Sequence, residues 1–287
     1  MKAKLLFLHA LSPLHAGTGQ GVGAIDLPIA REKATGIPIV PGSTLKGVLR
    51  SNCEADDTLK AKVFGPETDN AHEHAGSAQF SDLRLLFLPV RSLAGTFAWV
   101  TSPLLLQRLQ RDCQMANTLF TSAIPAVQAT DCLVSATSSQ VLTNVNQEAN
   151  NVILEDLLLK GTPSPAVDAL LNWLKPLLFG ADAAWGELFA ERLCVVHDDV
   201  LSFLLDTATE ITARIQLEKE KKTVARGALW YEEALPTESI LSGLLVVQTV
   251  EASEADVMNV VTGVTRSPLQ IGGNATVGRG VCRLHLT

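Results

Sequence analysis

A glycine-rich stretch near the start of the chain carries residues that could act on a phosphodiester. Residues 16–23 contain four glycines, His15 precedes them and Asp26 follows them. Glycine lacks a Cβ, so the backbone of such a stretch can approach a ligand closely. A nearby carboxylate can then hold a divalent cation or accept a proton from an attacking hydroxyl. A second interpretation stays open, in which Asp26 only stabilises a turn.

The same stretch does not predict dinucleotide binding. Residues 19–24 match the GxGxxA fingerprint, but that fingerprint requires a helix to begin at its end. Pro28 would interrupt such a helix in its first turns. Any chemistry at this loop therefore depends on Asp26 and His15 rather than on a pyrophosphate-binding helix.

Two further segments have residues suited to binding phosphates. A helix is predicted over about residues 44–52, with Ser43 as its N-cap, and it places Lys46 and Arg50 on one face. Free amides and the helix dipole favour anions at such a start. Residues 272–280 form a second glycine-rich loop, which includes Arg279. From the residues alone, a solvated helix face and an ordinary hairpin turn remain alternatives.

Composition bounds these interpretations. The 287 residues are 47% hydrophobic and 18% charged, which excludes disorder along the whole chain. A net charge of −7 argues against a general nucleic-acid binder, so any nucleic-acid contacts would have to come from local basic patches or from partners. Apolar runs are shorter than a membrane span, which predicts a cytoplasmic protein with no membrane partner. Five scattered cysteines predict buried thiols rather than disulfides or a zinc site.

The elements that must position these residues predict an α+β fold. Strand-like and helical segments at both chain ends favour one domain over residues 1–287, with a ferredoxin-like core and insertions at 65–76 and 114–151. In residues 211–231, alternating apolar flanks surround a charged centre. This pattern predicts a β-hairpin that projects from the core.

Three segments in this order resemble the RAMP proteins of CRISPR effector complexes: Pro-Leu-His-Ala-Gly-Thr-Gly at 13–19, Ile-Pro-Ile-Val-Pro-Gly-Ser-Thr-Leu-Lys-Gly-Val-Leu-Arg at 37–50, and Ile-Gly-Gly-Asn-Ala-Thr-Val-Gly-Arg-Gly at 271–280. The chain length, the place of Asp26 and residues 222–236 are most similar to the backbone subunit (Cas family 7 type) of type III-B (Cmr) complexes. The equivalent subunit of type III-A (Csm) complexes is an open alternative.

This resemblance implies a modified RRM-like, ferredoxin-type palm with a projecting β-hairpin thumb. It implies a crRNA-binding backbone subunit that cleaves complementary target RNA at regular intervals as a metal-dependent endoribonuclease. Asp26 corresponds to the catalytic, metal-binding aspartate, with Mg²⁺ or Mn²⁺ weakly bound, and His15 lies in the matching loop as a second catalytic candidate. Whether a glutamate on or beside the hairpin assists is left open among Glu218, Glu220, Glu232 and Glu233.

The resemblance also implies partners and guide contacts. The expected partners are the crRNA, the complementary target RNA, further copies of this chain in a helical filament, the large polymerase-like subunit, the small subunit and the other RAMP subunits. Guide contacts are expected from Ser43, Lys46, Arg50, Gly272, Gly273 and Arg279. Two alternatives stay open: a RAMP scaffold without catalysis, in which Asp26 is structural, and a pre-crRNA processing nuclease, which in this family typically uses a histidine and no metal.

Overall fold

The computed structural model describes residues 2–19, 21, 24–67, 74–145, 148–217 and 224–287. Within these residues, thirteen strands join in one sheet and two more form a separate hairpin. The palm is built around four antiparallel strands: β1 (Lys2–Ala10), β4 (Leu83–Arg91), β13 (Ile240–Val247) and β15 (Val281–Leu286). They lie side by side in the order β15-β1-β13-β4, with β1 paired to both β13 and β15. Numbered along the chain this is the 4-1-3-2 order of a ferredoxin-like core, as the sequence predicts.

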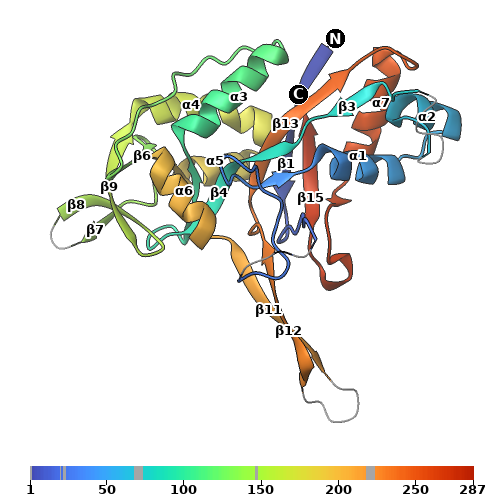
Figure 1. Cartoon of the computed structure of the whole chain (residues 1–287). Helices are drawn as coiled ribbons and strands as arrows, with labels where there is room; N and C mark the ends of the chain where they lie inside the picture. Colours follow the sequence, from blue (N-terminus) through green and yellow to red (C-terminus); the bar gives the residue numbers. More distant parts are fainter. Residues whose placement is uncertain (1, 20, 22–23, 68–73, 146–147, 218–223) are drawn as a thin grey trace.

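Helices cover this core near its β15 end (Figure 1). α1 (Gly42–Ser51), α2 (Asp57–Phe64) and α7 (Glu254–Thr265) contact one another, and α1 also packs beside β3 (Ala78–Phe80). Short strands β2 (Ile39–Val40) and β14 (Leu269–Gln270) pair with β4 and β15. α7 begins with a capping box in which Ser253 and Asp256 bond each other's backbone amides.

The prediction for the start of α1 is wrong by two residues. Pro41 occupies the N-cap position, and Ser43 lies inside the helix with no capping bond. Instead, the Asp82 carboxylate accepts a hydrogen bond from the Gly42 amide at 2.8 Å. A cap from Asp82, between β3 and β4, is invisible to local sequence patterns, because those patterns report only neighbours along the chain.

The region between β4 and the hairpin forms a second lobe on the same sheet. Its elements are β5 (Phe97–Thr101), α3 (Pro103–Met115), β6 (Asp131–Ser135), β7 (Thr143–Val145), β8 (Glu148–Leu154), β9 (Leu157–Ser164), α4 (Pro165–Phe179), α5 (Ala183–Arg192), β10 (Leu193–Val196) and α6 (Asp198–Thr207). Residues 114–151 thus contribute the end of α3 and three strands. Of the 65–76 segment, residues 68–73 lie outside the described part of the chain.

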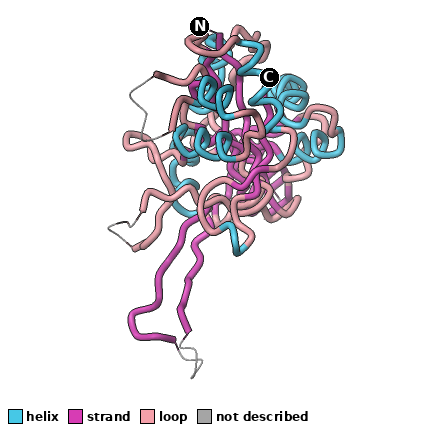
Figure 2. Tube along the Cα trace, turned by 90° about the vertical axis from the view of Figure 1, so that its right-hand side faces the viewer, coloured by secondary structure: helices cyan, strands magenta, loops and turns pink. Residues whose placement is uncertain are grey.

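A long hairpin leaves the palm as a thumb. β11 (Glu210–Leu217) pairs antiparallel with β12 (Val224–Ala234), with Ile211 opposite Glu233 and Ile215 opposite Leu229. Figure 2 shows its far end standing well away from the body. The predicted hairpin is therefore confirmed.

The burial of apolar side chains and of the cysteines agrees with what the composition predicts. A continuous apolar core runs through both lobes and includes the nearly inaccessible Phe7, Phe87 and Trp99. All five cysteines are buried and unpaired, as predicted, and burial raises the pKa of Cys113 and of Cys282 to about 12. Among the described helices, none combines the length and the apolar character needed to cross a membrane.

Candidate functional site: the root of the thumb

Asp26 lies at the base of the thumb, on a segment that runs beside β12. Its exposed carboxylate accepts a hydrogen bond from the Tyr231 amide at 2.7 Å. The Leu27 amide donates to the Tyr231 carbonyl, and the Leu27 carbonyl accepts from the Glu233 amide, both at 3.0 Å. The segment after the first glycine loop thus makes a parallel bridge to the thumb. The geometry fixes where the carboxylate stands while leaving it open to solvent.

Glu233 holds the same segment from inside. Its side chain is 3% exposed and forms an ion pair with Arg31 at 2.5 Å, while its other oxygen accepts from the Ile29 amide at 3.1 Å. Buried carboxylates need such partners, because an unpaired charge away from water is costly. Glu233 therefore binds the Asp26 segment at Ile29 and at Arg31.

His15 is locked between the thumb and both glycine loops. Its Nδ1 lies 2.6 Å from the Glu233 carbonyl oxygen; a carbonyl can only accept, so Nδ1 is protonated and donates. The Gly273 amide donates to the His15 carbonyl at 2.9 Å. A Cβ at Gly17 would stand 2.5 Å from His15 Nε2. The partners of His15 and Asp26 on β12 are two residues apart, roughly 7 Å along a strand.

The second glycine loop depends on its glycines for shape. Gly272 has φ +79°, and a Cβ there would overlap the His15 carbonyl oxygen. Asn274 also adopts the left-handed conformation, with φ 64°. Its amide nitrogen donates to the Glu232 carboxylate at 3.0 Å. The loop is thereby pressed against His15 on one side and tied to the thumb on the other.

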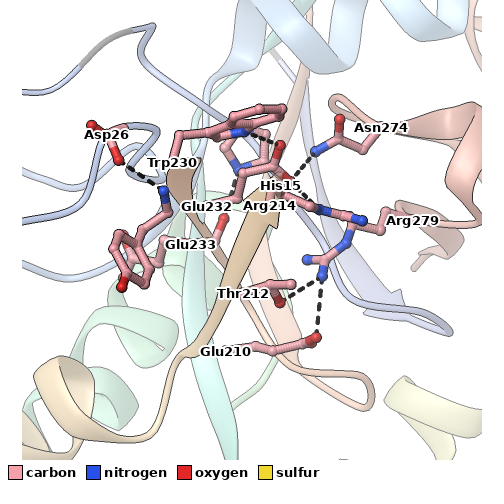
Figure 3. A network of polar contacts seen from close by, with 11 residues as sticks. His15, Asp26, Glu210, Thr212, Arg214, Trp230, Glu232, Glu233, Asn274 and Arg279 are labelled. Atoms are coloured by element: carbon pink, nitrogen blue, oxygen red, sulfur yellow. Dashed lines mark hydrogen bonds and ion pairs between the residues drawn. The ribbon is translucent and has the colours of Figure 1, made fainter. Parts of the chain in front are cut away.

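Glu232 is buried and fully engaged. Besides Asn274, it accepts hydrogen bonds from Trp230 Nε1 at 2.9 Å and Arg214 Nε at 3.1 Å (Figure 3). Burial alone would raise the pKa of this carboxyl, but the bonds from Trp230 and Arg214 and the charges of Arg214 and Arg279 outweigh it, so the pKa lies below its usual value. The carboxylate stays ionised at neutral pH, with each oxygen already bonded.

Arg279 joins the glycine loop to the other thumb strand. Its guanidinium is buried and donates through Nη2 to Thr212 at 2.9 Å and to Glu210 at 3.2 Å. Its Nη1 is buried and has no hydrogen-bond partner within the described residues. As the structure stands, Arg279 links the loop to the thumb and does not stand on an exposed phosphate-binding surface.

Lys46 and Arg50, the two basic residues predicted on one face of the helix, have different surroundings. Arg50 donates to the carbonyls of Gly65 and Pro66, so its guanidinium holds the loop after α2. Lys46 is half-buried, has no acidic partner in the described part of the chain, and lines a cavity of about 370 Å³ together with Ser43. Lys46 and Ser43 thus remain available to a ligand, away from the thumb root.

Sequence reasoning missed Arg31 and Asn274 at this site. The place of Asn274 directly after two glycines could have indicated its conformation, because asparagine, like glycine, can adopt the left-handed conformation. Nothing local marks Arg31. Of the four glutamates left open, Glu232 and Glu233 are both occupied, while Glu218 and Glu220 lie outside the described residues.

The described residues offer few side-chain donors for a divalent cation at this site. No cluster of three or more metal-ligating side chains occurs among the residues that the structure describes. Asp26 supplies one exposed carboxylate there. Mg²⁺ is commonly bound through one or two carboxylates, with substrate phosphates and water completing its coordination. The donor set fits such a shared site.

A ferredoxin-like palm, a projecting hairpin and two glycine loops at its root define a class of protein. The profile of the RAMP superfamily matches residues 7–283, and the chain belongs to this superfamily.

Particular relatives are similar along the whole chain. The CRISPR system Cmr endoribonuclease Cmr4 of Pyrococcus furiosus is 38% identical, over 100% of this chain and 96% of its own length. The crystal structure of oligomeric Cmr4 from the same organism superposes with a TM-score of 0.79 and 31% identity, covering 100% of this chain and 98% of that one. A subunit of the type III-B Cmr-beta complex bound to cognate target RNA has a TM-score of 0.74 at 21% identity, with 100% and 97% coverage, which supports the fold alone.

Proposed function

We propose that this chain is a crRNA-binding backbone subunit of a type III-B CRISPR complex. We propose further that it cleaves complementary target RNA, with Asp26 as a catalytic residue. The observation that carries the proposal is the exposed Asp26 carboxylate, held by the Tyr231 amide at the root of the thumb. It occurs in a chain that is 38% identical, end to end, to a Cmr endoribonuclease. The cytoplasmic location that the sequence predicts stays a prediction.

The thumb and Asp26 would act on the same nucleotide. The thumb separates one target nucleotide from the guide and turns its 2′-hydroxyl in line with the adjacent phosphorus. Asp26 would hold a divalent cation, Mg²⁺ or Mn²⁺, or accept the proton of that hydroxyl, as its oxygen bonds to phosphorus and the bond from phosphorus to the 5′-oxygen breaks. When bound, the cation supplies positive charge to the phosphate oxygens as negative charge builds up on them. His15, whose Nδ1 proton is committed to Glu233, supports the scissile region by keeping both loops against the thumb.

Guide binding would rest on few contacts per copy. Sequence-blind binding uses phosphates and 2′-hydroxyls rather than base edges, so a net charge of −7 is tolerable when copies share a guide. Lys46, Ser43 and the loop at Gly272 are the candidates left open by the contacts above. Gly273, Arg50 and Arg279 already have intramolecular partners. We therefore assign them to holding the shape of the surface that binds the guide. Copies of this chain and the other Cmr subunits would complete the filament.

The test uses the complex assembled with crRNA and its partner subunits. End-labelled complementary RNA is incubated with and without EDTA, using wild type and Asp26→Ala. We expect regularly spaced products that disappear with EDTA and fall by about 10²- to 10⁴-fold in the variant, the range for loss of a group that transfers protons. Asp199→Ala removes a side chain that is 88% exposed, and this variant should cut normally.

Two outcomes would contradict the proposal. Tight target binding without cleavage by the wild-type complex would mean a scaffold, with Asp26 as a loop residue. Cleavage of precursor guide RNA that persists in EDTA would mean a processing nuclease.

A further inference from the structure

We propose that Arg31 is a positioning residue for target cleavage, because it fastens both ends of the thumb to the segment that carries Asp26. The inference rests on the proposed function and adds to it the way in which the thumb sets the place of the carboxylate. Arg31 does not reach the reacting atoms. It acts through Glu233 and through the backbone of α6.

Arg31 fixes the segment behind Asp26. The guanidinium donates to the Glu233 carboxylate at 2.5 Å and to the Gly36 carbonyl at 2.8 Å. Ile29, between Asp26 and Arg31, donates its amide to the other oxygen of Glu233. Residues 26–31 are therefore attached to β12 at both ends, by Tyr231 near Asp26 and by Glu233 near Arg31.

The same guanidinium also reaches the other end of the thumb. Arg31 Nη2 donates to the Leu205 carbonyl at 2.9 Å, in the last turn of α6. α6 ends at Thr207 and β11 begins at Glu210. Arg31 thus bonds both α6, which precedes the thumb, and β12, the second strand of the thumb. Arg suits this role because its planar, five-donor head can serve a carboxylate and carbonyls at once.

The consequence is mechanical coupling between thumb and carboxylate. A thumb displaced by RNA would pull on Glu233, and the Asp26 segment would follow. Without Arg31, the segment keeps its contacts to Tyr231 and the Ile29 bond to Glu233, but it loses the side chain that ties Glu233 to α6. Displacements of about 1 Å at a reacting group cost on the order of a hundredfold in rate. Target affinity should change little, since Arg31 is mostly covered and its partners are protein atoms.

A matched pair elsewhere separates positioning from simple stability. Arg84 and Asp112 form a second ion pair, with 19% and 3% exposure against 22% and 3% for Arg31 and Glu233. It joins β4 to α3. Neutralising both members of either pair leaves no unpaired buried charge, so both double variants should fold.

The experiment compares Arg31→Met/Glu233→Gln with Arg84→Met/Asp112→Asn in the assembled complex. Single-turnover cleavage, target binding, melting temperature and the Mn²⁺ concentration for half-maximal rate are measured for each. We expect similar melting shifts and target affinities within about twofold of wild type. Only the Arg31 pair should cut slower, by about ten- to a hundredfold, and need more Mn²⁺. Arg31→Lys, which keeps the charge without the fork, should fall between.

Wild-type rate and Mn²⁺ requirement in the Arg31 double variant would overturn the inference, as would an equal loss of rate in the Arg84 pair. Asp26→Ala is run alongside. If that variant cuts normally, the proposed function fails and the inference falls with it, a result distinct from failure of the Arg31 arm alone.

Discussion

Two adjacent glutamates at the root of the thumb bind different loops in different ways. Glu232 and Glu233 are neighbours on β12, so their side chains point to opposite faces of the strand. Both are buried and both meet an arginine. The donors to Glu233 come from the Asp26 segment itself, through Arg31 and the Ile29 amide. Two of the three donors to Glu232 belong to the thumb, and Asn274 alone comes from the glycine loop.

The difference indicates what gives each loop its shape. The Asp26 segment takes its path from contacts with Glu233, so changes in that carboxylate should reach Asp26. The glycine loop has one side-chain bond to Glu232. It packs closely against His15 because Gly272 has no side chain. The Asp26 segment thus depends on a buried ionic clamp, whereas the glycine loop depends on its left-handed glycines together with the bonds from Arg279 to Thr212 and Glu210. Substitutions on the two sides should therefore have different signatures.

The largest effect on stability is expected from Gly272→Ala. The added Cβ would overlap the His15 carbonyl, and alanine would be forced into φ +79°. Left-handed strain costs about 1–3 kcal/mol and overpacking a similar amount. We expect a loss of about 3 kcal/mol in the free energy of unfolding, measured by urea denaturation.

Gly278→Ala is the control for this substitution, because its φ is +80° but no atom lies within 4 Å of its Cβ position. It should cost about 1 kcal/mol, from backbone strain alone. Equal losses in the two variants would show that the approach to His15 does not determine the loop.

A smaller and pH-dependent effect is expected from Glu232→Gln. The variant keeps the shape but loses charge-assisted bonds, which predicts a loss of about 1–2 kcal/mol at pH 7. Because folding lowers the pKa of Glu232 below 4.5, its stabilisation is present above that value and is lost as the pH falls through the folded pKa. Urea denaturation at several pH values should show wild type and variant converging as the pH falls below 4.5.

A difference between wild type and Glu232→Gln that is constant from pH 7 to pH 3 would contradict this. It would mean that the carboxylate contributes by shape rather than by charge. In that case the two glutamates would differ in kind as well as in their partners.

The palm and the thumb could be predicted from the sequence because their signals are local. Alternating apolar residues on both flanks of 218–222 indicate a hairpin. Asp26 and His15 are candidates because they flank a glycine-rich stretch and because of the resemblance to RAMP proteins, and their catalytic role stays a prediction. Their surroundings could not be found in this way: Arg31 meets Glu233 across 202 positions, and Asp82 caps α1 across 40. Long-range pairing of charged groups leaves no periodic trace.

The smallest effect on stability is expected on the outer face of the thumb, from Leu229→Thr. Leu229 is 53% exposed and lies opposite the equally exposed Ile215. Threonine is β-branched and favours strands, and exposed substitutions usually change stability by less than about 0.5 kcal/mol. Its neighbour Trp230 faces the root, so Trp230→Phe, which removes one donor to Glu232, should cost about 1–2 kcal/mol by the same urea measurement. A Leu229→Thr loss as large as that of Trp230→Phe would mean that contacts along the whole thumb, rather than the clamp at its root, hold the hairpin in place.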